Sequence, residues 1–449
     1  MRLGVRVLMM LGLSLAILVP LAMIRDTIHE RQDYRGQAVR DIAASYAGAQ
    51  GLAGPVLVVP YVETVVVEEK DGQGNPRRVQ RDRAGRWTFF PQRVDLAGRL
   101  QPATRKRGLH EVRVYELQGD LAATFRADIP EDPDPALPRR IGRPWLGYGI
   151  SDVRGLAGSP RLQVGGTPVA LEQGLGSRDG GGVHARLEAP LAGSRHEIDT
   201  RLRFALGGTE SLALAPLGRH NRVVLDSPWP HPQFNGQFLP RTRTIRADGF
   251  HAEWEVSSLA TNARAQYLAG ATSPLPQGGG DRDGKSRGGG LEAIGLSLVD
   301  PVNFYSQADR ASKYGLLFVL LTFVGFFMFE LIKQLPIHPI QYLLVGLALA
   351  IFFLLLLSLS EHIAFGRAYL AAGTACIGLL GFYLSHVLRS RARGLGFATM
   401  LATLYAALYG LLVSEDNALV LGTGLLFLIL AALMVVTRKV DWYRLAHAR

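Results

Sequence analysis

Cysteine is almost absent from this chain. Among 449 residues only Cys376 is a cysteine, and it falls within a long apolar run. Residues 25–313 therefore contain no thiol, which excludes a disulfide scaffold or a thiolate zinc site there. This large region must fold on its hydrophobic core alone, which is compatible with a bacterial periplasm.

Known catalytic motifs are also missing. The sequence has no G-x-S-x-G nucleophile elbow, no H-E-x-x-H zinc motif and no G-x-x-x-x-G-K-[ST] phosphate loop. We predict no catalytic residue, no metal site and no cofactor. A hydrolase built on His231 or His362 would lack a positioned nucleophile and base.

Charge is missing from three long apolar runs. Residues Ile340 to Ser360, Leu395 to Val413 and Leu419 to Val436 contain no Asp, Glu, Lys, Arg or His. An ion-coupled pump normally needs ionisable groups inside its membrane helices, so these runs disfavour one. A lipid path would need fewer charges, which keeps a transporter as the alternative.

Six runs are long and apolar enough to cross a bilayer core of about 30 Å. They are Val5–Ile24, Tyr314–Ile332, Ile340–Ser360, Ala368–Leu388, Leu395–Val413 and Leu419–Val436. The first has a basic start but is too long for a signal peptide and has no small-residue cleavage site, so we interpret it as a retained anchor. We predict an N-terminal anchor (residues 1–24) and a five-span bundle (314–437).

The positive charges of the short connections predict the orientation. The side that holds the N-terminus would receive ten basic residues: Arg2, Arg6, Lys333, Arg389, Arg391, Arg393, Arg438, Lys439, Arg444 and Arg449. The opposite short loops hold Arg367 alone. By the positive-inside rule both termini, including a tail at 438–449, are cytoplasmic and residues 25–313 are periplasmic. Topology thus accounts for most of the net charge of +11, and nucleic acid need not be a partner.

Residues 25–313 are predicted to form a helical stalk (25–48) and a β-rich region (54–257). Residues 196–206 and 250–256 alternate apolar and polar side chains, as half-buried strands do, and pairs such as Gly207-Gly208 suggest turns. The fold class is therefore a helical membrane protein with a large, mainly β, sandwich-like periplasmic domain, in one or two parts. A Gly-, Asp- and Arg-rich insert at 274–290 should be mobile.

Three groups of residues are candidate sites. In Ser227 to Pro240 four prolines stiffen the chain, and Trp229, His231, Phe234 and Phe238 could line a binding groove for a sugar or an extended peptide; alternatively the rings plug one end of the sandwich. An outer polar cluster would comprise Asp309, Arg310, Lys313, Glu361 and His362, and would dock the bundle to the domain. An inner polar cluster would comprise Glu330, Lys333 and His338. These residues would either pair structurally or have a functional role.

A shared metal can be excluded for the two histidines that flank the third run. His338 and His362 are 24 residues apart, which is about 36 Å along a helix. A lone Glu361-His362 pair is weak support for a metal or acid-base site, so a polar helix end is the preferred interpretation.

The sequence resembles the CreD family of inner-membrane proteins over nearly its whole length. The matching residues include Ile24-Arg25, Glu30-Arg31, Asp33-Tyr34-Arg35, Gly54-Pro55, Trp229-Pro230-His231-Pro232, Lys313-Tyr314, Phe329-Glu330, His338 to Gly346, Leu359 to His362, Leu421-Gly422-Thr423 and Asp441-Trp442-Tyr443. The resemblance implies an inner-membrane protein that supports envelope integrity, and it brings no reaction and no catalytic residues.

We therefore expect a non-enzymatic envelope protein whose β domain binds a periplasmic protein or an envelope glycan while its helices lie in the bilayer. The alternative is a six-span lipid or small-solute transporter, gated by Glu330 and the outer polar cluster.

Overall fold

The computed structural model describes residues 3–70, 76–134, 136–176, 180–190, 192–275, 290–298, 304–333, 337–388, 390–414 and 418–438. Nearly all of the predicted insert (274–290) and tail (438–449) lies outside these ranges. The chain divides into two compact units. Met1–Arg35 with Val302–Arg449 is called the helical unit, and Gly36–Pro301 is called the β domain.

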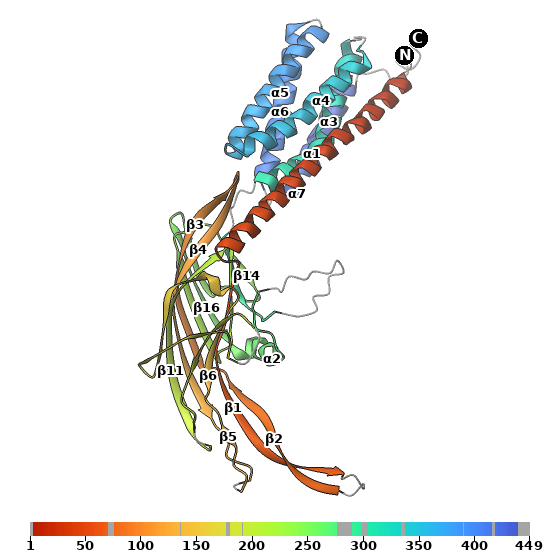
Figure 1. Ribbon diagram of the computed structural model, residues 1–449. Helices are drawn as coiled ribbons and strands as arrows, with labels where there is room; N and C mark the ends of the chain where they lie inside the picture. Colours follow the sequence, from red (N-terminus) through yellow and green to blue (C-terminus); the bar gives the residue numbers. More distant parts are fainter. Residues whose placement is uncertain are drawn as a thin grey trace. The chain divides into compact units, whose positions relative to one another are not determined.

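The helical unit contains the apolar helices that the sequence predicts (Figure 1). They are α1 (Leu3–Ser45, whose last ten residues belong to the β domain), α3 (Phe304–Lys333), α4 (Pro339–Ser360), α5 (Phe365–Val387), α6 (Arg391–Val413) and α7 (Ala418–Thr437). The predicted anchor and stalk are one continuous helix of 43 residues, about 65 Å long at the usual rise.

The number of membrane-crossing helices differs from the predicted six. Among the described residues four helices are long and apolar enough: Leu11–Ser45, α4, α5 and α6. A fifth is α3, if its two parts, Tyr305–Gly315 and Leu317–Met328, form one span despite a bend of 41°. In α7 the apolar segment Val420–Ala431 is shorter than a span, so the predicted sixth crossing stays a prediction.

The β domain is built from two sheets. The first has the order β14 (Pro232–Gly236), β17 (Ile294–Leu298), β12 (Ser211–Ala215), β1 (Gln50–Lys70), β6 (Trp145–Ile150), β10 (Gly182–Arg186) and β9 (Glu172–Gln173), with β2 (Pro76–Phe89) and β5 (Arg140–Ile141) also paired to β1. The second has the order β15 (Thr242–Arg246), β16 (Gly249–Ser257), β13 (His220–Ser227), β3 (Arg93–Arg107), β4 (His110–Asp128), β11 (Arg195–Thr209), β7 (Leu156–Val164) and β8 (Thr167–Val169). Short helices η1 (Val153–Gly155), η2 (Ser258–Ala260) and α2 (Ala263–Leu268) complete it.

One apolar core lies between the sheets, so the β domain is a sandwich with mixed strand pairing. The pairs β1–β12 and β3–β13 are parallel, and the other pairs are antiparallel. The predicted alternation is confirmed: Leu202, Phe204 and Leu206 of β11 are buried, as are all four predicted core residues of β16. Strands also lie outside the predicted range 54–257, since β1 begins at Gln50 and β17 follows the insert.

The predicted turn at Gly207-Gly208 is wrong, because both residues lie inside β11. A Cβ on Gly207 would come within 2.4 Å of the Tyr46 hydroxyl, and one on Gly208 within 2.5 Å of the Tyr115 ring. These glycines therefore permit close packing of tyrosines against a strand, which is the other common reason for glycine in a sheet.

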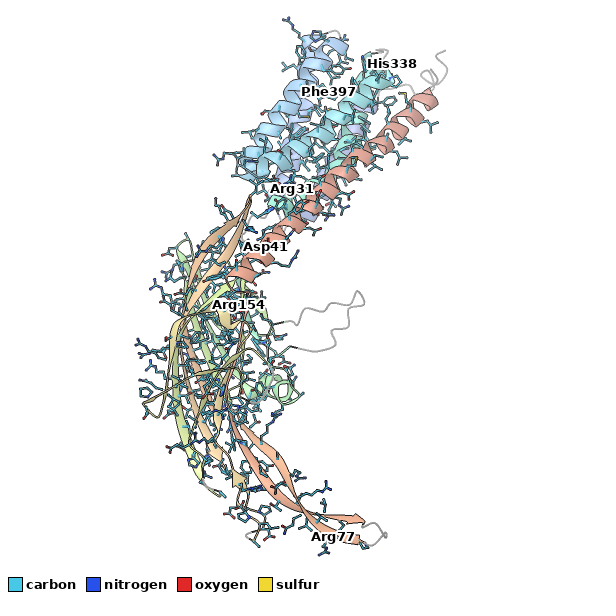
Figure 2. The ribbon with its side chains drawn as sticks, viewed as in Figure 1. Arg31, Asp41, Arg77, Arg154, His338 and Phe397 are labelled. Atoms are coloured by element: carbon cyan, nitrogen blue, oxygen red, sulfur yellow. The ribbon has the colours of Figure 1, made fainter. Side chains whose placement is uncertain are left out.

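The strands β1 and β2 continue beyond the sheet as a two-stranded ribbon. From Glu63 to Lys70, β1 pairs with β2 alone among the described residues, and the ribbon projects from the domain in Figure 1. Arg77 lies near its tip in Figure 2.

The end of α1 is held by a hydrogen bond from Arg154, which also forms an ion pair with Asp152. Arg154 donates to the Ala44 carbonyl at 2.6 Å, near the helix end labelled by Asp41 in Figure 2. Asp152 accepts from Arg154 at 2.6 Å and from the Gly48 backbone N–H at 3.0 Å. A cation at the helix C-terminus also matches the sign of the helix dipole.

We expect Asp152→Asn to lower the stability of the β domain by about 1 kcal/mol at neutral pH, because Arg154 is half exposed and solvent screens the pair. The hydrogen bond from Arg154 lowers the pKa of Asp152 below its usual value. A lowered carboxyl pKa stabilises the fold above the unfolded-state pKa, and this stabilisation is lost as the pH falls through the folded-state value. The difference between wild type and variant should therefore shrink below about pH 4.

Urea unfolding of the full-length protein in detergent micelles, followed by tryptophan fluorescence, measures this difference. The background Trp442→Phe restricts the signal to the four tryptophans of the β domain. A difference that stayed constant from pH 7 to pH 3 would contradict the assignment.

Candidate functional site

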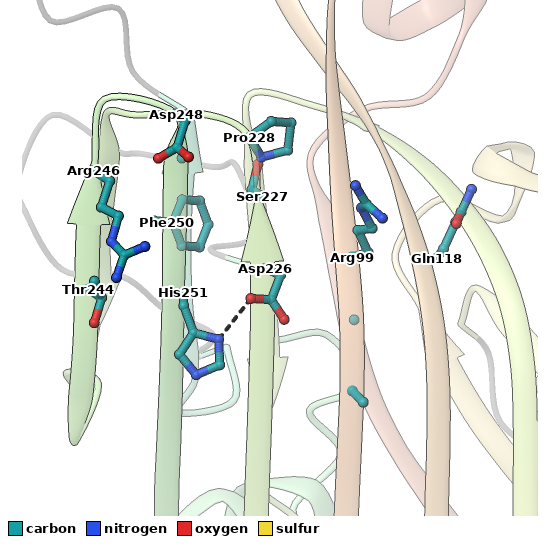
Figure 3. Close-up of a pocket in the computed structure, with 13 residues that line it drawn as sticks. Arg99, Gln118, Asp226, Ser227, Pro228, Thr244, Arg246, Asp248, Phe250 and His251 are labelled. Carbon is teal, nitrogen blue, oxygen red and sulfur yellow. Dashed lines mark hydrogen bonds and ion pairs between the residues drawn. The ribbon is translucent and has the colours of Figure 1, made fainter.

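A depression of about 900 Å³ lies on the solvent-facing side of the second sheet (Figure 3). The strand register brings one residue from each of five strands into a row that crosses it: Thr244, His251, Asp226, Arg99 and Gln118. Four strand spacings make this row about 19 Å long. Ala97, two residues from Arg99 on the same face, carries only a methyl group and leaves space beside it.

Charged side chains of both signs line the depression. In its middle His251 Nδ1 and Asp226 Oδ1 are 2.8 Å apart. Arg246 lies on one side of this pair and Arg99 on the other, with Asp248 at the edge (Figure 3). Within the described part of the chain, Arg99, Arg246 and Asp248 have no ion-pair partner, so all three are available to a ligand.

Two arginines near the depression on the same face are neutralised. Arg201 binds Asp120 at 2.7 Å, and Arg222 binds Glu253 at 2.6 Å. The hydrogen bond from Arg201 lowers the pKa of Asp120, so this carboxyl is charged at neutral pH. The charges at these two neighbouring positions are thus paired, whereas Arg99, Arg246 and Asp248 in the depression have no such pairing among the described residues.

The predicted groove residues lie next to this depression but do not line it. Trp229, Phe234 and Phe238 are half-buried against the core of the sandwich, and His231 is exposed. Phe234 contacts Trp254 edge to face at 5.5 Å, and the Phe238 carbonyl accepts from Trp254 Nε1 at 3.2 Å. These contacts are compatible with the alternative, in which the rings close one end of the sandwich, and the binding groove stays a prediction.

The outer polar cluster is brought together in part. Asp309 accepts from Lys313 at 2.7 Å and lies 3.4 Å from Arg25 and 3.5 Å from His29, both on α1. Arg310, half-buried, is next to Asp309 on α3.

The other two members of that cluster have different neighbours. Glu361 meets Arg31 of α1 at 3.7 Å. The exposed His362 is 3.2 Å from the Ser358 carbonyl in its own turn. The recorded ion pairs therefore join α1, α3 and the end of α4, and the docking role stays a prediction.

The inner polar cluster contains a buried pair that the sequence did not predict. Glu330, 4% exposed, accepts from the Tyr342 hydroxyl at 2.6 Å. His338 instead caps α4, with its ring accepting from the Ile340 N–H at 3.4 Å and its own N–H bound by Gln341 at 3.0 Å. The Lys333 side chain lies outside the described residues.

Only some of the site residues that the sequence prediction missed had a signal in the sequence. Tyr342 belongs to the His338–Gly346 stretch, so that stretch is partly explained as a helix cap followed by the partner of Glu330. Arg99 and Arg246 lie on strands and Asp248 lies in the turn between β15 and β16, and none of the three carries a local motif. The strand register brings Arg99 to the same depression as Arg246 and Asp248.

Apolar helices joined to a large two-sheet β domain define an integral membrane protein with a folded domain outside the bilayer-crossing segments. A family profile described as "Inner membrane protein CreD" matches residues 2–443. Inner membrane protein CreD of Escherichia coli (strain K12) is 35% identical over 436 residues, which cover 96% of this chain and 92% of that protein. The chain therefore belongs to the CreD family and is an inner membrane protein.

Solved structures give only distant likenesses. An M1 zinc metallopeptidase from Deinococcus radiodurans has 16% identity and a TM-score of 0.21, covering 37% of this chain and 38% of that one. Leukotriene A4 hydrolase from Saccharomyces cerevisiae has 11% identity and a TM-score of 0.21, covering 38% of this chain and 27% of that one. The match spans well under half of these peptidases, and such scores carry no argument about activity.

Proposed function

We propose that this protein supports cell-envelope integrity without catalysis, by binding an envelope ligand or protein partner through its β domain. The depression on the second sheet carries this proposal, because its volume suits a ligand and its charges are unpaired. In the proposed topology both termini are cytoplasmic and the β domain is periplasmic, as the distribution of Lys and Arg favours.

Photo-crosslinking in cells tests the binding. A photoreactive residue at Thr244 or Gln118, at the two ends of the row, should capture an envelope component. The same residue at Leu259, which is 97% exposed and outside the depression, is the control. Capture at all three positions, or at none, would contradict the proposal.

A second variant links binding to the envelope. Ala97→Trp should fill the depression, abolish capture and fail to restore detergent resistance to cells that lack the gene. Full rescue by a folded Ala97→Trp protein would show that the depression is not needed for envelope integrity.

A further inference from the structure

We infer that the depression binds a zwitterionic peptide ligand in extended form. Arg99 and Arg246 would hold two acidic groups of this ligand, and Asp248 would hold an ammonium group. This inference rests on the proposed function, since it names the chemical class of ligand for the same site. It follows from the charges, the spacing and the side chains that the depression lacks.

The charges of the depression favour a ligand with both signs. Two guanidinium groups and one carboxylate are exposed and have no ion-pair partner among the described residues. The remaining acid, Asp226, is already bound to His251. A guanidinium binds a carboxylate with two parallel hydrogen bonds, and a carboxylate binds an ammonium group, so a ligand with acidic and basic groups satisfies all three.

The spacing sets the size of this ligand. Arg246 is on β15 and Arg99 is on β3, three strands further along the sheet and two residues away along the strand direction, a separation of roughly 16 Å between backbones. Arginine side chains are long enough to bridge part of this gap, and three extended residues span about 10 Å. A short extended peptide with a carboxylate near each end therefore fits between the two arginines.

The aromatic content of the depression disfavours a neutral sugar. Phe250 is the one aromatic residue among its lining residues apart from His251, and it is 4% exposed. Sugar rings commonly stack on exposed aromatic faces, and this surface offers none among the described residues. A lipid phosphate would satisfy the arginines but would leave Asp248 facing a like charge.

Binding of a synthetic peptide to the full-length protein in detergent micelles tests the inference. The peptide Glu-Ala-Ala with free termini carries one carboxylate near each end and one ammonium group. Arg99→Ala and Arg246→Ala should each weaken its binding about tenfold or more, as loss of a charge-assisted hydrogen-bond pair does. Asp248→Asn should weaken binding of the free peptide but not of its N-acetylated form.

Arg243→Ala provides the matched control. Arg243 is an exposed arginine of the same strand, β15, but it does not line the depression. Its removal should leave binding within twofold of wild type. Equal losses of peptide affinity in Arg243→Ala and Arg246→Ala would show that general electrostatic attraction causes the effect. That result would overturn the inference.

Two further outcomes separate the inference from the proposed function. Arg99-dependent binding of phosphatidylglycerol vesicles, without binding of the peptide, would identify a lipid phosphate as ligand and overturn the peptide. If no probe binds while Ala97→Trp still abolishes crosslinking and rescue, the peptide inference fails and the proposed function stands. If Ala97→Trp also has no effect, both fail.

Discussion

Replacing Trp254 by alanine should destabilise the β domain by about 4 kcal/mol, the usual cost of deleting a buried aromatic side chain. Trp254 is fully buried, contacts the Phe234 ring at 5.5 Å and donates to the Phe238 carbonyl at 3.2 Å. Its loss should therefore also loosen residues 228–240, which limited proteolysis would detect as faster cleavage there. Urea unfolding of the full-length protein in micelles measures the change in stability.

Two variants calibrate this prediction. Trp254→Phe keeps a ring but loses the hydrogen bond, and we expect a cost of about 1–2 kcal/mol. Leu259→Ala, at a side chain that is 97% exposed, should be nearly neutral. If Trp254→Ala were as stable as Leu259→Ala, the rings of this segment would not be structural, and the groove would regain support.

In the helical unit, Tyr342→Phe should destabilise the protein by about 1–2 kcal/mol, the usual cost of removing one buried hydrogen bond. Tyr342 is 1% exposed and donates to Glu330 at 2.6 Å, which joins α4 to α3. A double-mutant cycle with Glu330→Gln isolates the energy of this pair. Denaturation of the full-length protein with increasing SDS in mixed micelles provides the measurement.

An exposed pair in the same unit is the matched control. Tyr34 donates to Glu30 at 3.1 Å across one turn of α1, and Tyr34 is 48% exposed. Tyr34→Phe should therefore cost little. Equal costs for Tyr34→Phe and Tyr342→Phe would contradict a stabilising role for the buried pair.

The same Glu330→Gln variant separates the structural interpretation from the transporter. If Glu330 serves the packing of α3 and α4, the movement of labelled lipid in proteoliposomes should be the same for wild type and variant. Lipid movement that required the intact carboxyl would favour the transporter instead.

The sequence predicted features that depend on local pattern. Apolar runs predicted the helices, and the period of two in β11 and β16 predicted which of their residues are buried. It could not predict contacts that depend on long-range register. Asp226 and Arg99 lie opposite each other on the neighbouring strands β13 and β3, although they are 127 positions apart in the sequence. Nothing local to either residue indicates the other.

Gly207 and the inner polar cluster also depend on contacts that the local sequence does not indicate. Gly207 is compatible with a turn or with a close approach, and only the position of Tyr46 decides between them. The sequence suggested Lys333 and His338 as neighbours of Glu330, whereas the hydrogen bond recorded for it comes from Tyr342 on the next helix. Neighbours along the chain were a poor guide where helix packing determines the partners.

The ribbon of β1 and β2 has a consequence for crowding in the membrane. Its run Val65-Val66-Val67 is β-branched, and Val66 and Val67 are 51% and 37% exposed, so its edge is suited to pairing with a strand from another copy. Arg77, Arg78, Arg81, Arg83 and Arg86 lie on the neighbouring strand of the same ribbon. Two copies that met along β2 would place these guanidinium groups about 5 Å apart, where like charges repel. Glu68 and Glu63 of β1 bind Arg78 and Arg83, so the repulsion comes mainly from the other arginines of β2. Chains confined to a surface meet far more often than chains in solution, and there this repulsion would disfavour pairing of identical neighbours along β2.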